Sequence, residues 1–138
     1  MVLRTSSQAK VVVPYGQMGV GTNDIPDDYR VAIDGKVICE ELKVQLSQNW
    51  PDYVFEKNYD LKSLEEVEAT IKEVGHLPGV QSAKEIEAAG GVELGEMTFN
   101  QQEKIEEIYL HLIEMNKTMK TLKAENEQLK ATVKALQN

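Results

Sequence analysis

An apolar heptad repeat fills the last third of the chain and predicts a long amphipathic helix. From residue 105 to residue 136, apolar side chains recur at alternating steps of three and four, and Asn126 is the one polar residue in the series. A helix with this 3.5-residue period cannot bury its apolar stripe by itself. We therefore predict that residues 98–138 form a coiled-coil oligomerisation helix. Its interface, called the seam below, consists of Ile105, Ile108, Leu112, Met115, Met119, Leu122, Asn126, Leu129, Val133 and Leu136.

The heptad leaves the number of helices in the coil open. Ile105 and Ile108, at the start of the seam, favour three or more helices. Asn126 at position a, followed by Leu129 at position d, favours two. Dimer and trimer are both compatible with this pattern.

The apolar stripe is widest near its N-terminal end, where Tyr109, Leu110 and Ile113 lie beside the seam. A coiled-coil seam does not need this extra apolar surface, so we expect another part of the protein to pack there. Beyond Lys117, the residues outside the seam include many Lys and Glu side chains, which is typical of a solvated coiled coil. This mixture of charges disfavours a helix that lies on a membrane surface.

Residues 1–46 alternate short β-rich runs with turn residues. Such runs occur at residues 10–13, 16–22 and 29–33, and Asp34-Gly35 follows as a strong turn signal. The strand pattern resumes after this turn and continues to residue 46. These runs are too short and too sparsely apolar to form a sheet that is stable by itself.

The sequence pattern of residues 47–97 predicts short helices joined by tight turns. Two Ser-x-x-Glu capping boxes, at residues 63–66 and 82–85, each open a helix. Gly75 and Gly90 are placed to end these helices. We therefore expect a small knob built from these elements.

The densest aromatic cluster of the chain, Trp50-Pro51-Asp52-Tyr53-Val54-Phe55, precedes the first of these helices. We interpret it as the anchor of the knob rather than as a ligand platform, because a small core needs its few large side chains for packing. The predicted knob core consists of Trp50, Tyr53, Phe55, Leu64, Val67 and Ile71.

The composition narrows the classes of partner. The chain carries a formal net charge of −8 and no basic stripe, which argues against a nucleic-acid partner. No apolar run is long enough to insert across a membrane, and residues 1–10 lack the apolar segment of a signal peptide. If the protein acts outside the cell, we expect this chain to be a fragment of a longer protein or to leave the cell by an unconventional route.

Catalysis and cofactor binding are not expected from the sequence. Cys39 is the sole cysteine, and we interpret it as a small buried hydrophobic residue. His76 precedes Leu77-Pro78 and has no second ligand at metal-binding spacing, so a turn residue is favoured over a metal ligand. The glycines at 16, 19 and 21 do not follow the order of a dinucleotide fingerprint. We predict no enzyme activity, no cofactor and no metal.

Several segments, in this order along the chain, resemble the C-terminal regions of tail-fibre-like proteins of phages and of Bacteroidetes surface proteins. The similarity runs from about residue 16 to residue 138. The segments that carry it are Gly19-Val20-Gly21-Thr22, Tyr29-Arg30-Val31, Asp34-Gly35-Lys36-Val37, Trp50-Pro51-Asp52-Tyr53-Val54-Phe55, His76-Leu77-Pro78-Gly79-Val80, Ser82-Ala83-Lys84-Glu85 and Leu94-Gly95-Glu96-Met97.

This resemblance implies an α+β fold in which three identical chains intertwine. Residues 1–46 would form a β-rich fibre end, residues 47–97 a small α/β knob and residues 98–138 a parallel coiled coil. The layout is similar to that of the intramolecular chaperone domains of endosialidase tail spikes, which bring three chains into register. The implied location is a virion tail or an extracellular cell surface.

Some of those chaperone domains release themselves with a Ser and a Lys in a Ser-Asp-x-x-Leu-Lys type of motif. Here Ser47 lies near Lys43, but Gln48 and Asn49 follow it and no Leu-Lys pair lies downstream. We therefore expect no self-cleavage. The function implied by the resemblance is that of a structural homotrimerisation and registration module.

The alternative function is a fibre tip that binds a receptor or a glycan. The loops at residues 22–28 and 75–82 are the candidates for such contacts. Tyr29 is the aromatic residue nearest to them, and carbohydrate recognition would favour more aromatic side chains there.

Asn126 is expected to select the register of the coil, because a shifted pairing would place its amide against an apolar residue. Replacing it in Asn126→Leu or Asn126→Ile should raise the thermal stability and loosen the choice of oligomer. Thermal unfolding and solution mass measure these two effects. A single solution mass for either variant would remove the registration role of this residue.

Overall fold

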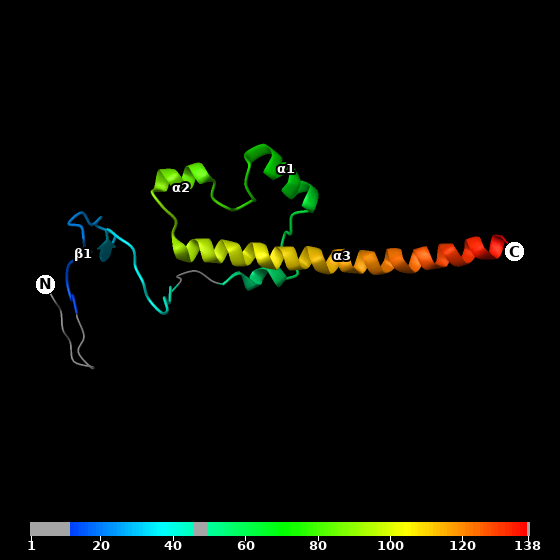
Figure 1. The fold of residues 1–138 in the computed structure, drawn as a ribbon, viewed down its shortest axis with the longest axis horizontal. Helices are drawn as coiled ribbons and strands as arrows, with labels where there is room; N and C mark the ends of the chain where they lie inside the picture. Colours follow the sequence, from blue (N-terminus) through cyan, green and yellow to red (C-terminus); the bar gives the residue numbers. More distant parts are fainter. Residues whose placement is uncertain (1–11, 46–49, 138) are drawn as a thin grey trace. The chain divides into compact units, whose positions relative to one another are not determined.

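The computed structural model describes residues 12–45 and 50–137. The chain has an α+β architecture, with a small two-stranded sheet and a long C-terminal helix (Figure 1). It divides into two compact units, residues 1–43 and residues 44–138. The two units are described separately below.

The first unit contains the sheet. Strand β1 (Met18–Val20) pairs in parallel with strand β2 (Val31–Ile33), and Gly19 lies opposite Ala32. The connection between the strands contains no helix, which is unusual because parallel strands are commonly joined by a helical crossover.

Side chains that bond to the backbone hold this connection in place. The Gln17 amide nitrogen donates to the carbonyl oxygens of Pro26 at 2.8 Å and Tyr29 at 3.0 Å. The Arg30 guanidinium donates to the Gly16 carbonyl oxygen at 3.0 Å. These side-chain bonds, together with the bond from the Tyr29 amide to the Pro26 carbonyl oxygen at 2.9 Å, hold a connection that has no helix of its own.

The strand expected over residues 36–46 is wrong for its described part, because residues 36–45 form no strand. Apolar residues in this segment remain open, and Ile38 is 98% exposed. Cys39 is also exposed, so its expected burial is wrong as well. A run with β propensity becomes a strand when an edge is available to pair with it, and this segment finds no such edge in the single chain.

In the described residues of the second unit, the structure has one long helix and three shorter helical segments. These elements are η1, a 3-10 helix (Pro51–Phe55), and the α-helices α1 (Leu64–Val74), α2 (Ala83–Ala89) and α3 (Leu94–Leu136).

The start and stop signals of α1 and α2 are confirmed. Ser63 accepts a hydrogen bond from the Glu66 amide at 3.3 Å, and the Glu66 carboxylate accepts one from the Ser63 amide at 2.8 Å. Gly75 ends α1 in the left-handed conformation, at a φ of 81°. The same reciprocal bonds occur at residues 82–85, and Gly90 ends α2 at a φ of 73°. Glycine suits these two positions because it has no Cβ to clash there.

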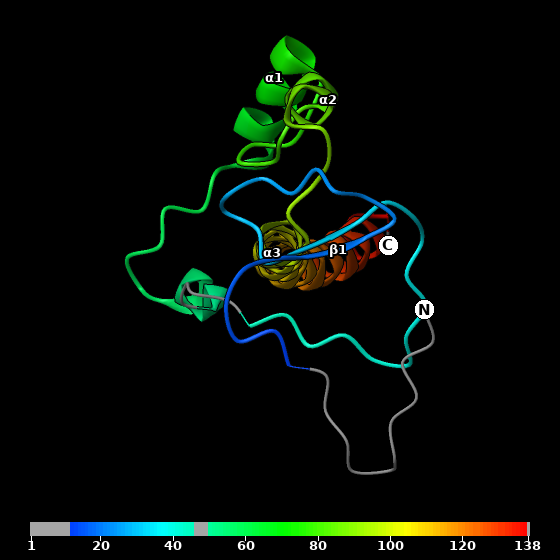
Figure 2. The same ribbon diagram turned by 90° about the vertical axis from the view of Figure 1, so that its left-hand side faces the viewer.

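Helix α3 has 43 residues, which corresponds to a length of about 65 Å at 1.5 Å per residue. It begins at Leu94, so residues 94–97 form its first turn. Helices α1 and α2, with the loop between them, lie on one side of α3 and are called the arm below (Figure 1). Viewed along α3, η1 and the arm occupy different sides of the long helix (Figure 2).

The buried apolar core within this chain is very small. Among the described residues, Val54 and Pro51 of η1 are the largest fully buried side chains. None of the described helices combines the length and the apolar character needed to cross a membrane.

Candidate oligomerisation surface

The short helix η1 packs on α3 through the apolar and aromatic side chains of its segment. Val54 is 1% exposed. The ring of Tyr53 lies 6.4 Å from the ring of Phe99 and 5.9 Å from that of Tyr59, measured between centroids. Such tilted aromatic pairs add to the stabilisation from burial alone. This contact is the best-packed part of the second unit.

Polar bonds surround the apolar contact. The Tyr53 hydroxyl donates to the Glu103 carboxylate, and the Tyr59 hydroxyl donates to Glu107 Oε1 at 2.5 Å. The Lys104 ammonium lies 3.0 Å from the Glu103 carboxylate and 2.8 Å from that of Glu107. Two tyrosines from the segment around η1 are thereby bonded to carboxylates on α3, and the lysine between these carboxylates offsets part of their charge.

The pKa values of these groups follow from this arrangement. The hydrogen bond to Glu103, together with burial and the nearby carboxylates, raises the pKa of Tyr53 to about 12. Burial and the bond to Glu107 also raise the pKa of Tyr59. Burial would raise the pKa of Glu103, but its bonds from Tyr53 and Lys104 outweigh this effect and hold the pKa below its ordinary value.

Glu106 is a buried carboxylate beside this cluster, with 5% of its surface exposed. Its Oε1 accepts a hydrogen bond from the Gln102 amide at 2.8 Å, whereas its Oε2 has no partner among the described residues. A buried acceptor without a partner destabilises the fold. The packing of η1 on α3 must therefore offset this cost.

The heptad positions of the contact residues show which side of α3 is covered. With Asn126 at position a, Phe99 and Glu106 occupy position b, Glu103 position f and Glu107 position c. Positions b, c and f lie on the side of a helix opposite positions a and d. Helix η1 therefore covers the outer side of α3 and leaves the predicted seam open.

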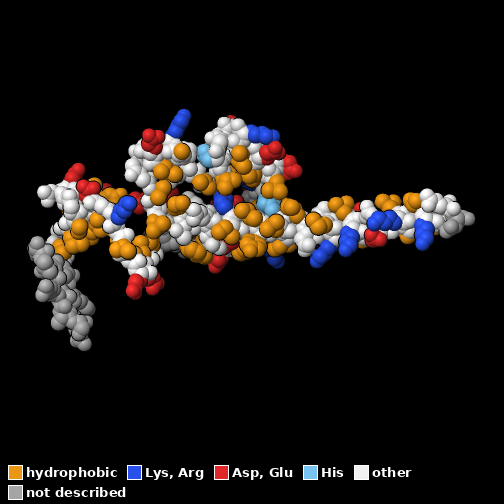
Figure 3. Space-filling view, in the orientation of Figure 1, with side chains coloured by type: hydrophobic (Ala, Val, Ile, Leu, Met, Phe, Trp, Pro, Cys, Tyr) orange, Lys and Arg blue, Asp and Glu red, His pale blue; other side chains and the backbone are white. Residues whose placement is uncertain are grey.

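The seam residues are exposed in the single chain. Their exposed fractions include 47% for Ile105, 49% for Leu112, 59% for Leu122 and 81% for Leu136. Asn126 is exposed with them. Burying such half-exposed aliphatic side chains would contribute roughly 1 kcal/mol each. Hydrophobic side chains visible along α3 in Figure 3 continue into its C-terminal half, where charged groups lie between them.

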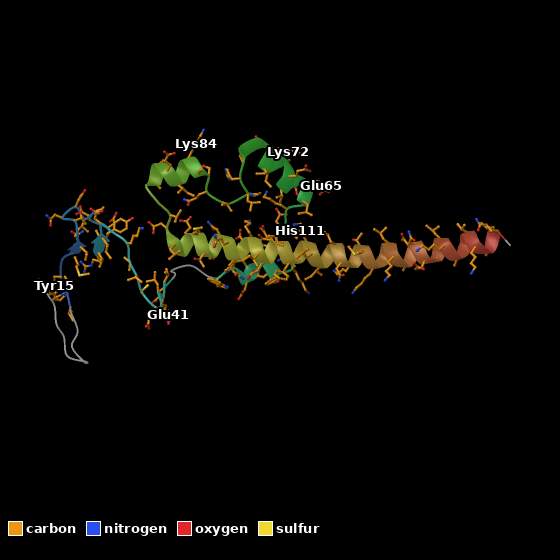
Figure 4. All side chains as sticks on the ribbon, in the orientation of Figure 1. Tyr15, Glu41, Glu65, Lys72, Lys84 and His111 are labelled. Carbon is orange, nitrogen blue, oxygen red and sulfur yellow. The ribbon has the colours of Figure 1, made fainter. Side chains whose placement is uncertain are left out.

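The arm forms a groove with one flank of α3. Leu64 of the arm and Met115, Met119 and Leu122 of the seam line one part of this groove, which has a volume of about 460 Å³. His111 of α3 lies below the arm in Figure 4, and Lys72 and Lys84 point away from α3. The groove is therefore continuous with the seam, and the charged side of the arm faces outward.

The residues of the predicted knob core differ in how far they are buried. Trp50 is 46% exposed and Phe55 56%, whereas Tyr53 is half-buried against α3. On α1, Leu64 and Ile71 are 49% and 42% exposed. Val67 is half-buried. These side chains do not close into one core within the single chain.

The sequence did not indicate several residues of the contact between the segment around η1 and α3, namely Tyr59, Phe99, Glu103, Lys104, Glu106 and Glu107. The widened apolar stripe near the start of the seam was a signal for such packing, because Tyr109, Leu110 and Ile113 add apolar side chains outside the seam. That stripe did not indicate which segment of the chain would pack on it.

The expected turn role of His76 agrees with its contact, because its Nδ1 lies 3.1 Å from the Leu77 carbonyl oxygen. In the described ranges, no three His, Cys, Asp or Glu side chains form a group that could hold a metal ion. Ser47, considered above for self-cleavage, lies outside the described residues.

The chain was compared with known protein families, curated proteins and solved structures. No family model, curated protein or solved structure matches the chain.

The hydrogen bond between Tyr53 and Glu103 should make part of the folding stability depend on pH. Folding lowers the pKa of Glu103. The stabilisation from its ionised carboxylate is therefore complete above the pKa of the unfolded chain, about 4.3, and is lost as the pH falls through the lower pKa of the folded chain. Tyr53→Phe should lower the free energy of unfolding by about 1 kcal/mol at neutral pH, a value that already allows for the partial exposure of the pair. This loss should shrink progressively as the pH falls below about 4.

Chemical unfolding of the unmodified chain and of Tyr53→Phe across this pH range measures the difference in their free energies of unfolding. Tyr15→Phe serves as the matched control, because Tyr15 lies in the first unit and is 89% exposed. A cost of Tyr53→Phe that stays the same at every pH would contradict the assigned bond.

Proposed function

We propose that this chain is a structural homotrimerisation and registration module of a fibre protein. In this proposal, α3 joins two further copies of itself in a parallel coiled coil, and the β-rich first unit belongs to the end of the fibre. The resemblance to tail-fibre-like proteins and to the chaperone domains of endosialidase tail spikes supports the fibre context, including its virion-tail or cell-surface location.

One observation carries the proposal. Helix η1 and the nearby Tyr59 cover positions b, c and f of α3, and the a and d positions stay exposed along the whole seam. A monomeric helix would use its most apolar side for internal packing. Here the most regular apolar stripe is left free and the less apolar outer side is covered, which favours a partner helix on the seam.

The number of copies rests on the start of the seam and on the resemblance. Ile105 at position a and Ile108 at position d favour three helices over two. Tyr109, at position e beside the seam, is 59% exposed, and additional copies would bury such flanking surface. A trimer is therefore the proposed state.

Registration follows from the order of events in fibre assembly. Intertwined strands form many non-local contacts, and chains that pair out of register become trapped or aggregate. A coiled coil that forms early holds the neighbouring β segments at a high effective concentration. Val31 and Ile33 of β2 are 46% and 43% exposed, so strands from other copies would have apolar surface to cover.

Replacing a seam residue by a charge tests the proposal. Leu122→Asp should abolish the trimer, because loss of a buried leucine costs about 2–5 kcal/mol per chain and three carboxylates would meet at one level of the coil. Sedimentation equilibrium of the full chain measures the mass. Thr121→Asp is the matched control, because residue 121 occupies the outer position c of the same turn.

The control should keep the mass of three chains, while Leu122→Asp should give single chains. Equal masses for the two variants would contradict the role of the seam.

A further inference from the structure

We infer that the arm of one chain closes over α3 of a neighbouring copy, and that Tyr109 of this neighbour inserts between the arm and the first α3. This inference rests on the proposed function, because it requires a second copy on the seam.

The receiving site has walls from two elements. Leu64, Val67, Leu77 and Pro78 of the arm form its apolar wall, and Ile108 belongs to its α3 wall. Lys104, Glu107 and His111 add polar groups on the α3 side. The site therefore offers aliphatic surface to a flat apolar group and polar atoms at its border, which suits a side chain with an apolar body and a polar tip.

The heptad identifies the part of a neighbour that would face this site. Lys104 and His111 occupy position g, and Ile108 occupies position d. In a parallel coil in register, position g of one helix lies beside position e of the next heptad in its neighbour. The e residue that corresponds to Lys104 is Tyr109, five residues later.

Tyr109 differs from the other residues at position e. Gln102, Asn116, Lys123 and Lys130 are all polar. Tyr109 is the aromatic member of this series and is 59% exposed in the single chain. Its place along α3 coincides with the level of the arm.

The arm itself has apolar surface that its own α3 leaves uncovered. Leu64 is 49% exposed and Leu77 is 41% exposed, although both line the receiving site. Loop residue Gly79 approaches the Lys104 side chain, so the arm reaches α3 at the level of position g. The receiving site shares Leu64 and His111 with the groove, which is lined by Met115 and Leu122 of the seam, where the neighbouring helix would lie. A second copy is therefore the occupant that fills the seam and the groove together.

Cross-linking between differently tagged copies tests the inference. Two full-length variants in a Cys39→Ser background, Leu77→Cys with one tag and Tyr109→Cys with another, are co-expressed and treated with a short bismaleimide. We expect a cross-linked product that carries both tags. The matched control replaces Tyr109→Cys by Lys123→Cys, which lies at position e beyond the arm and should give no product above background.

The solution mass of the same mixtures separates the possible failures. Trimers without the two-tag product would overturn the inference and leave the proposed function intact. Equal products with Lys123→Cys and with Tyr109→Cys would overturn the inference too, because the arm would then lack a fixed site. Single chains in solution would overturn the inference and the proposed function together.

Discussion

The seam of α3 is the constraint on which the rest of the structure depends. A stripe of aliphatic side chains with a 3.5-residue period runs along this helix and stays exposed in the single chain. Hydrophobic burial is the main source of folding free energy, and this chain buries little beyond Val54 and Pro51 in its described residues. We propose that contacts between chains supply the missing burial.

The packing of η1 agrees with this constraint. Tyr53 and Tyr59 bond to Glu103 and Glu107 on the outer side of α3, so the anchor of the second unit does not compete with the seam. The arm adds a second wall beside the seam, with its charged side outward (Figure 4). Together these elements allow a neighbouring helix to approach the seam without any rearrangement of the contact between η1 and α3.

Local signals in the sequence predicted local structure well. The boxes at residues 63–66 and 82–85 and the glycines at 75 and 90 act within one or two helical turns, and the structure confirms them. The contact of Tyr53 with Glu103 joins residues fifty positions apart, and no periodic pattern encodes such a pair. The expected strand after Gly35 and the expected burial of Cys39 were wrong because both depended on neighbours that the single chain does not provide.

The mass of the full chain in solution tests the central claim most directly. Light scattering behind size exclusion, repeated over a range of protein concentrations, gives this mass independently of shape. The proposed assembly predicts three chains of 15.5 kDa each in one particle. A single chain at every concentration would contradict an oligomer built on the seam, and a stable dimer would contradict the trimer.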